Sequence, residues 1–242
     1  MYANLIHDAG MLEELIAKER NFFFLLNGSD SITMDYFMYL YSYKFTWIPF
    51  FICLFLLFLK KYQKDPKECI LLFLSIFVLL LLCDRVTSGL IKPIFESLRP
   101  THHPDYKDLV DTVLGYRGGR FGFASSHAAN IFGFAFFSAF LVRKRYFSLL
   151  IYLHALLTIY TRIYLGVHFI TDVTAGALIG TIIAIPVLIL YLLMRNFVRT
   201  RDNQPVALPV YSYRDIRCVF ITYFATIIIL LVFNNQLIKF IT

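Results

Sequence analysis

The chain alternates between long apolar stretches and short polar connections. Apolar residues dominate 36–60, 67–91, 168–194 and 218–240. Two shorter apolar stretches, 127–142 and 147–165, are separated only by a basic Arg-Lys-Arg-Tyr turn. A helix needs about 20 mainly apolar residues to cross a bilayer. The pattern therefore predicts an all-α membrane protein with six spanning helices.

The N-terminal segment has a different pattern. Between residues 11 and 26, apolar side chains such as Leu15 and Phe22 can share one broad face, opposite Glu14 and Lys18. This segment carries too many charges to span a bilayer, so we expect an amphipathic helix that lies in the membrane interface. The expected parts are an interfacial helix within 1–30, a core of five spans at 36–194, a basic connection at 195–217 and a sixth span at 218–240.

Composition supports a membrane protein and excludes several other classes. Hydrophobic residues make up 59% of the 242 residues and charged residues 16%, whereas soluble domains carry about 25% charged residues. The net charge of +7 comes from basic residues that lie mainly between the apolar stretches, so we expect no nucleic-acid partner. The four cysteines lack metal-ligand spacing, and we expect neither a metal site nor a disulfide framework.

Basic residues are distributed unevenly over the connections. They are concentrated after the first, third and fifth predicted spans. The residues are Lys60, Lys61, Lys64, Lys67, Arg143, Lys144, Arg145, Arg195, Arg199, Arg201, Arg214 and Arg217. The positive-inside rule places these three connections in the cytoplasm. The connections at 92–126 and 165–168 are then expected to face outward.

Residues that can carry chemistry gather at the outward ends of the second to fifth spans. In chain order they are Lys92, Arg99, Ser125, Ser126, His127, Arg162, His168 and Asp172. The three cations can surround a dianion, and arginine suits phosphate because its planar group donates two parallel hydrogen bonds. The two serines stand at a predicted helix start, where free backbone N–H groups favour anions.

Two histidines in this set suggest acid–base and nucleophilic chemistry. His168 and Asp172 are four residues apart, so we expect them on one face of a helix, where the carboxylate can orient the imidazole. His127 comes from a different segment and could donate a proton to a leaving oxygen. The sequence therefore predicts phosphoryl chemistry at this end of the protein.

This arrangement resembles the type 2 phosphatidic acid phosphatase family, which shares a fold core with vanadium haloperoxidases. The family's first motif, a Lys, six residues and Arg-Pro, is matched by Lys92, Arg99 and Pro100. The third motif, Ser-Arg, five residues, His, three residues and Asp, is matched by Arg162, His168 and Asp172, with Thr161 where the family has Ser. The second motif, Pro-Ser-Gly-His, reads Ala-Ser-Ser-His at 124–127, so its Pro and Gly are replaced.

The resemblance implies a role for each matched residue. His168 would attack phosphorus, Asp172 would orient it, and His127 would protonate the leaving group and then activate water. The phosphoryl oxygens would be held by Lys92, Arg99, Ser125 and Arg162. Ser126, which replaces the family's Gly, is a further phosphate-binding candidate because it stands at the same helix start. No metal and no cofactor is implied. Arg117 and Arg120, in the loop before the second motif, are candidate contacts to a further part of the substrate.

The resemblance also narrows the substrate and the location. The run of the sequence is similar to envelope phosphatases of Bacteroides-type bacteria, which implies the inner membrane, a site that faces the periplasm and no obligate protein partner. Lipid A phosphate is favoured, undecaprenyl diphosphate follows, and a phospholipid phosphate also fits. A lipid phosphotransferase and a non-catalytic anion or lipid transporter are the alternatives, and the paired His168 and Asp172 disfavour the transporter. A haloperoxidase fits the motifs, but that class is soluble as a rule.

Overall fold

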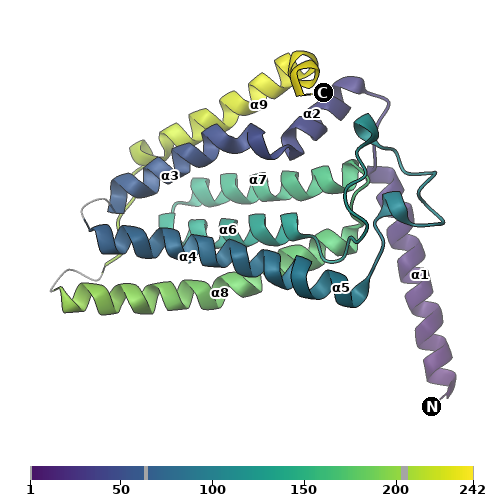
Figure 1. The fold of residues 1–242 in the computed structure, drawn as a ribbon, viewed down its shortest axis with the longest axis horizontal. Helices are drawn as coiled ribbons and strands as arrows, with labels where there is room; N and C mark the ends of the chain where they lie inside the picture. Colours follow the sequence, from purple (N-terminus) through teal and green to yellow (C-terminus); the bar gives the residue numbers. More distant parts are fainter. Residues whose placement is uncertain (1, 63–64, 203–206, 242) are drawn as a thin grey trace.

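The computed structural model describes residues 2–62, 65–202 and 207–241, and within them the chain is helical apart from its connections (Figure 1). The α-helices are α1 Tyr2–Leu26, α2 Ile32–Ser42, α3 Ile48–Tyr62, α4 Pro66–Asp84, α5 Lys92–Phe95, α6 Ser126–Val142, α7 Arg145–Tyr164, α8 Ile170–Arg201 and α9 Tyr213–Ile241. A 3-10 helix, η1 Lys44–Trp47, precedes α3, and a π-helix, η2 Arg85–Ile91, joins α4 to α5.

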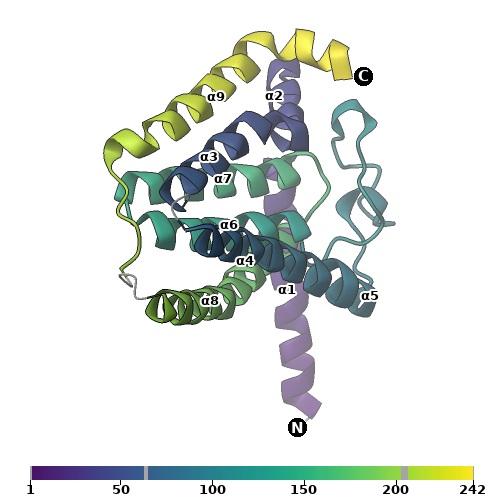
Figure 2. The ribbon, with the colours of Figure 1, turned by 60° about the vertical axis from the view of Figure 1, so that its left-hand side comes forward.

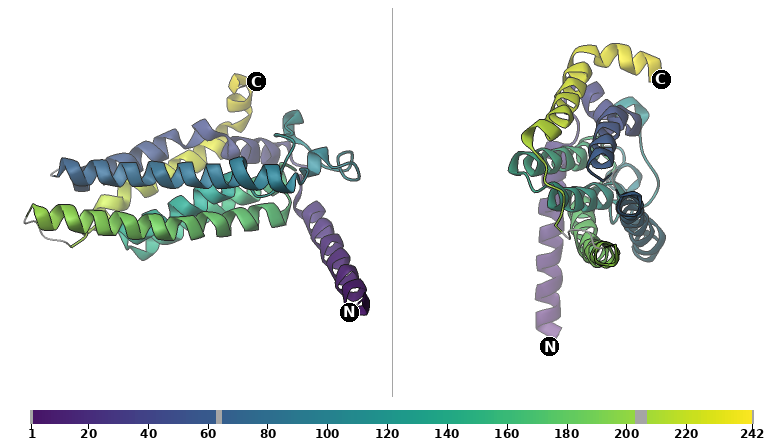
Figure 3. Two further views of the ribbon diagram at one scale, coloured as in Figure 1. Left: turned by 60° about the horizontal axis from the view of Figure 1, so that its bottom comes forward. Right: turned by 90° about the vertical axis from the view of Figure 1, so that its left-hand side faces the viewer.

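Helix α6 forms the centre of a bundle in which it packs against α8, α7 and α4. These helices run side by side in two views, and α1 projects away from them (Figures 1 and 3). Gly176 and Gly180 allow α8 to approach α6, because a Cβ at these positions would come within 2.3 Å of Ser125 O and 2.0 Å of Ala129 O, respectively. Small residues let helix backbones approach closely in membrane proteins. The beginnings of α6 and α8 are therefore held together.

The predicted membrane character is confirmed, while the span count is not fully reproduced. Five helical stretches are long and apolar enough to cross a membrane, and they include α7, α8 and α9. The other two are Lys44–Tyr62 and Pro66–Phe95. The expected span at 127–142 corresponds to α6, which is apolar but has only 17 residues.

The expectation of one continuous helix over 36–60 is wrong. Helix α2 ends at Ser42, and Tyr43 has an extended backbone with φ −75° and ψ 123°. Side chains satisfy the carbonyl groups that the break exposes: Thr46 Oγ1 donates to Leu40 O at 2.6 Å, and Trp47 Nε1 donates to Tyr41 O at 2.7 Å. Helix α3 then starts anew, so Pro49 lies in its first turn rather than inside a longer span.

The connections divide between the two ends of the bundle as the charge pattern predicts. The three basic connections, α3–α4, α6–α7 and α8–α9, lie at one end, called here the basic end (Figure 1). Lys64 and residues 203–206 lie outside the described residues. The loop over 96–125 and the α7–α8 turn lie at the other end, called the site end (Figure 1).

Helix α9 lies against α2 and α3 on one side of the bundle. It bends at Phe233, where φ is −112° and ψ is 17°, and its last turns point away from the bundle (Figure 2). Tyr223, from the part before the bend, packs against Trp47 with ring centroids 5.3 Å apart. Helix α9, the sixth expected span, therefore packs against the break between α2 and α3 and supports it.

Candidate active site

The turn between α7 and α8 carries His168, and the first turn of α8 carries Asp172. The Nδ1 atom of His168 lies 3.2 Å from Oδ2 of Asp172, and both side chains are buried. The same carboxylate oxygen accepts the backbone N–H of Phe169 at 3.0 Å, which caps the helix. His168 precedes α8, so the two residues do not share a helix face as expected. The carboxylate instead reaches back from the helix start to the turn.

His168 is fixed by its backbone as well as by Asp172. The N–H groups of Val167 and His168 both donate to Arg162 O, at 3.1 and 3.2 Å. Burial, together with the neighbouring Arg99 and Arg162, lowers the pKa of His168 well below its usual range. The imidazole is therefore neutral, and with Nδ1 donating to Asp172 its Nε2 lone pair is available to a ligand.

Arg99 connects the loop of the first motif to the His168 turn. Its Nε donates to Phe121 O at 3.1 Å and its Nη1 donates to Val167 O at 3.1 Å. The backbone around it is held by a bridge between Leu98 and Phe121. Burial, followed by the charge of Arg162, lowers the pKa of Arg99 to about 10. Arg99 thus remains charged near neutral pH and is bonded to the backbone of the residue before His168.

The second motif begins helix α6. Ser125 is its N-cap, accepting the Ala128 N–H at 3.4 Å, and its own N–H donates to Asp172 O at 2.9 Å. Ser126 Oγ accepts a hydrogen bond from Lys92 Nζ at 3.2 Å, which joins the first motif to the second. His127 is exposed to the cavities described below. The start of α6 therefore presents Ser126, Lys92 and His127 together.

Arg162 is nearly inaccessible, with 2% of its surface exposed. One guanidinium nitrogen donates to Ser42 Oγ and another donates to Tyr116 OH, the latter at 3.0 Å, while its Nε has no hydrogen-bond partner among the described residues. Within the described part of the chain, no carboxylate oxygen lies within 4.0 Å of a guanidinium nitrogen of Arg99 or Arg162. Their charge is thus available to an anionic ligand.

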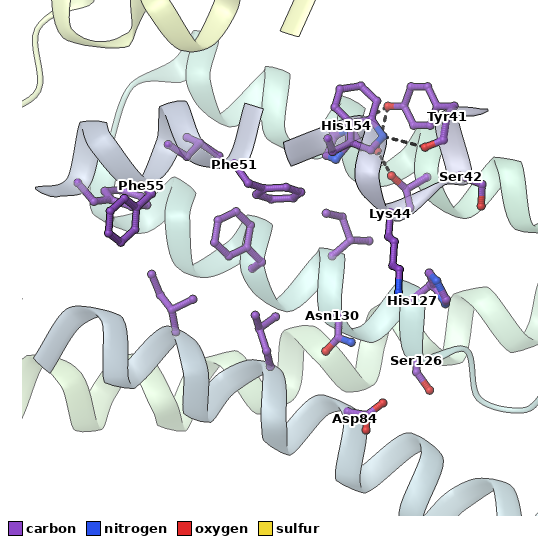
Figure 4. Close-up of a pocket in the computed structure, with 18 of the residues that line it drawn as sticks. Tyr41, Ser42, Lys44, Phe51, Phe55, Asp84, Ser126, His127, Asn130 and His154 are labelled. Atoms are coloured by element: carbon purple, nitrogen blue, oxygen red, sulfur yellow. Dashed lines mark hydrogen bonds between the residues drawn. The ribbon is translucent and has the colours of Figure 1, made fainter. Parts of the chain in front are cut away.

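Two cavities open beside these residues; Ser126, His127 and Arg162 line them, and His168 lies behind this lining without being part of it. The smaller, of about 220 Å³, is lined by Arg162, Tyr116 and His127 among others. The larger, of about 480 Å³, begins at Ser126 and His127 and continues between the helices along mainly apolar side chains (Figure 4). The site therefore has a cationic part and an apolar part.

The structure brings the eight residues predicted from the three motifs to the site end, and two other candidates lie apart from them. The side chains of Arg117 and Arg120 are exposed and line neither cavity. Arg117 donates to Thr101 O at 3.2 Å, and Arg120 lies over the ring of Phe121. Their contact with substrate stays a prediction.

Three residues at the site were missed by the sequence reasoning. Ser42 and Tyr116 hold Arg162, and neither residue type nor spacing distinguishes them from other hydroxyl residues. Lys44, which lines both cavities, did have a signal. A lysine inside a stretch read as a membrane span is costly unless it has a function.

Helix α1 also contacts the site from outside the bundle. Glu19 Oε1 accepts the backbone N–H of Thr171 at 2.8 Å and its hydroxyl at 2.9 Å. The guanidinium of Arg20 lies 3.2 Å from the ring centroid of Phe169. Asn27, directly after α1, donates to Tyr164 O at 2.8 Å. These contacts hold both sides of the turn that carries His168.

Comparison with known proteins identifies the family. A family model described as the PAP2 superfamily matches residues 68–199. A lipid A 4'-phosphatase of Porphyromonas gingivalis is 41% identical over 186 residues, which cover 76% of this chain and 78% of that protein. A lipid A 4'-phosphatase of Bacteroides thetaiotaomicron is 37% identical over 171 residues, which cover 70% of this chain and 75% of that protein. A solved structure, that of Aquifex aeolicus LpxE, aligns with a TM-score of 0.49 and 26% identity over 69% of this chain and 93% of that chain. Since the family model spans more than half of the chain and includes the beginnings of α6 and α8, the chain belongs to the PAP2 superfamily.

Proposed function

We propose that this protein is a lipid A phosphatase that hydrolyses the 4'-phosphate monoester through a phosphohistidine on His168. The observation that carries the proposal is the buried His168–Asp172 pair beside two arginines that have no carboxylate partner among the described residues. The names of the relatives in two Bacteroides-type bacteria support lipid A as the substrate. No observation specifically favours undecaprenyl diphosphate.

The first chemical step forms a bond between His168 Nε2 and phosphorus. The bond from phosphorus to the sugar oxygen breaks, and His127, in its protonated form, gives its proton to that oxygen. Asp172 accepts the hydrogen bond from Nδ1 and so stabilises the positive charge that develops on the ring. Arg99 and Arg162 stabilise the negative charge on the equatorial phosphoryl oxygens.

The second step returns the enzyme to its starting state. His127, now neutral, takes a proton from water as the water oxygen attacks phosphorus, and the bond from phosphorus to Nε2 breaks to release inorganic phosphate. Lys92 and the α6 start, with Ser125 and Ser126, hold the phosphoryl group through both steps. The chemistry then depends on positioning and charge, without a resident metal.

We further propose that α6 completes a six-span bundle and that the site end faces the periplasm of a bacterial inner membrane. Packing of α6 at the centre of the bundle supports the first point, because a buried helix can be shorter than one that faces lipid. The gathering of basic connections at the opposite end supports the second. Helix α1 would then lie in the outer interface, next to the site.

The test is phosphate release from lipid A by the purified protein in detergent with EDTA present. We expect release by the wild type and by His103→Ala, whose histidine belongs to none of the three motifs, and none by His168→Ala. The wild type, but not His168→Ala, should retain an acid-labile phosphate label after rapid quenching. Release that requires added metal, or that persists without His168, would contradict the mechanism. Label transfer to an added lipid alcohol in place of phosphate release would indicate a phosphotransferase, and no reaction would favour a transporter.

A further inference from the structure

The larger of the two cavities, called here the apolar groove, has a polar end and an apolar remainder. Ser126, His127 and Lys44 lie at the polar end (Figure 4). From there the groove runs between α3, α4, α6 and α7 over about 480 Å³. Aromatic and aliphatic side chains line it, among them Phe134 from α6 and Ile76 from α4. It is therefore long and apolar away from the phosphate-binding residues.

The groove reaches the outer surface of the bundle between α3 and α4. Its lining residues Phe51, Phe55 and Leu80 are 37%, 46% and 36% exposed. The rings of Phe55 and Phe73 meet across this boundary, with centroids 4.6 Å apart. Since α3 and α4 belong to the stretches that can cross a membrane, this side faces the hydrocarbon of the bilayer. A hydrocarbon chain could enter here without crossing a polar surface.

The groove is continuous with the cationic part of the site. Ser42, Lys44 and His127 line both cavities, so the two cavities meet at these side chains. The amine of Lys44 points toward His127 at this junction (Figure 4). A molecule that fills both spaces has a phosphate at one end and a hydrocarbon chain at the other.

We infer that the apolar groove holds one acyl chain of the lipid whose phosphate is cleaved at His168. This inference rests on the proposed function and names the part of the substrate that the groove recognises. A lipid tail in a bilayer is already in an apolar environment, so transfer to the groove gains little from the hydrophobic effect. The groove therefore selects by fit: a chain of suitable length aligns the head group with His168, and a misfit displaces it.

The test narrows the groove and compares substrates with different chains. Ile76→Trp introduces a large side chain into the groove from α4. Leu74→Trp places the same residue on the same helix at a position that is 53% exposed and does not line the groove. The substrates are a glucosamine phosphate with long acyl chains and the same compound with short chains. The measured quantity is the ratio of kcat/KM for the long-chain compound to kcat/KM for the short-chain compound.

We expect Ile76→Trp to lower this ratio about tenfold, since overfilling a packed space costs energy that a short chain avoids. Leu74→Trp should keep the wild-type ratio. An unchanged ratio for Ile76→Trp would overturn the inference while leaving the proposed function intact, because the wild type would still release phosphate. An equal fall for both variants would also overturn it. Failure of the wild type to hydrolyse any of these compounds, or lipid A itself, would instead refute the proposed function.

Discussion

Buried arginines occur at both ends of the bundle, and they differ in their partners. At the basic end, Arg195 is 1% exposed and its guanidinium pairs with Glu68. At the site end, Arg162 is 2% exposed and its guanidinium bonds only to hydroxyl groups among the described residues. The two arginines are almost equally buried, but only the charge of Arg195 is balanced by a carboxylate among the described residues.

The basic end forms a closed ion cluster. Glu68 accepts hydrogen bonds from Arg195 and Arg199, and Arg199 lies 3.9 Å from a carboxylate oxygen of Asp65. Arg195 also donates to Ala207 O at 3.0 Å, which attaches the connection after α8. The cluster therefore joins the start of α4 to the end of α8. The positive and negative charges of the cluster balance each other within the protein, so we assign the cluster a structural role.

At the site end, neither Arg99 nor Arg162 has a carboxylate oxygen within 4.0 Å among the described residues. Arg99 and Arg162 donate to carbonyl and hydroxyl oxygens, which orient the guanidinium groups without cancelling their charge. Burial of charge without a counterion is costly. A phosphate dianion in the cavity would supply the missing counter-charge. The partner of a buried arginine, rather than its burial, thus distinguishes a structural arginine from a ligand-binding one.

The largest effect is expected from breaking the ion cluster at the basic end. Glu68→Gln removes the carboxylate that Arg195 and Arg199 share, and loss of one partner of a buried pair costs about 3–5 kcal/mol of stability. For a protein of this size the melting temperature should fall by roughly 6–20 °C. Thermal unfolding in detergent measures the shift, and kcat per folded molecule should stay near the wild-type value. Glu14→Gln is the control, since its pair with Lys18 is exposed and contributes little.

Removal of a buried charged side chain at the site end should lower activity without lowering stability. Arg162→Met removes a donor to the phosphoryl oxygens, and loss of one such group lowers kcat by about 10²–10³. Its melting temperature should equal or exceed that of the wild type, because an uncompensated buried charge is removed. Arg145→Met, at the other end of the same helix, should change neither value. If Arg162→Met unfolded as readily as Glu68→Gln, the distinction between the two ends would be wrong.

The elements of the fold that were predictable from the sequence are those with a strong periodic or charge signal. The sequence predicted α4, α7, α8 and α9 because each lies in an apolar stretch between polar connections. The break at Tyr43 was missed because apolar residues continue through it, and the side chains that stabilise it, Thr46 and Trp47, do so only in three dimensions.

At the site, the sequence predicted the residues whose type and spacing are distinctive. It did not predict the uncharged residues that hydrogen-bond to them. His168 and Asp172 follow a spacing that resembles a known family, and the structure places them in contact. Tyr116 contacts Arg162 across 46 residues of sequence, and nothing in its neighbourhood predicts that contact. The apolar groove could not be predicted from the sequence either, because most of its lining residues are of the same types as those that pack the core.

A smaller effect is expected where α1 supports the His168 turn. Glu19→Ala removes the carboxylate oxygen that accepts two hydrogen bonds from Thr171, at the start of α8. A slight shift of Asp172 and His168 should lower kcat roughly tenfold, since catalysis is sensitive to small misplacements. KM should stay unchanged, because no substrate contact is lost, and Glu19→Asp should recover part of the rate. Glu14→Ala on the same helix should behave as the wild type, and an equal loss in that variant would contradict a positioning role for Glu19.

The smallest effect is expected at Lys44, where the two cavities meet. Lys44→Met removes a charge that is exposed and has no carboxylate within 4.0 Å among the described residues. Exposed charges act weakly and are screened by salt, so KM should rise only about three- to fivefold at low ionic strength. The difference from the wild type should shrink as salt is added, whereas the defect of Arg162→Met, which comes from a buried group, should persist. Lys60→Met, near the other end of the stretch Lys44–Tyr62, is the control. A salt-independent defect at Lys44 would mean that this residue acts as Arg162 does, and the cationic part of the site would then extend to the mouth of the groove.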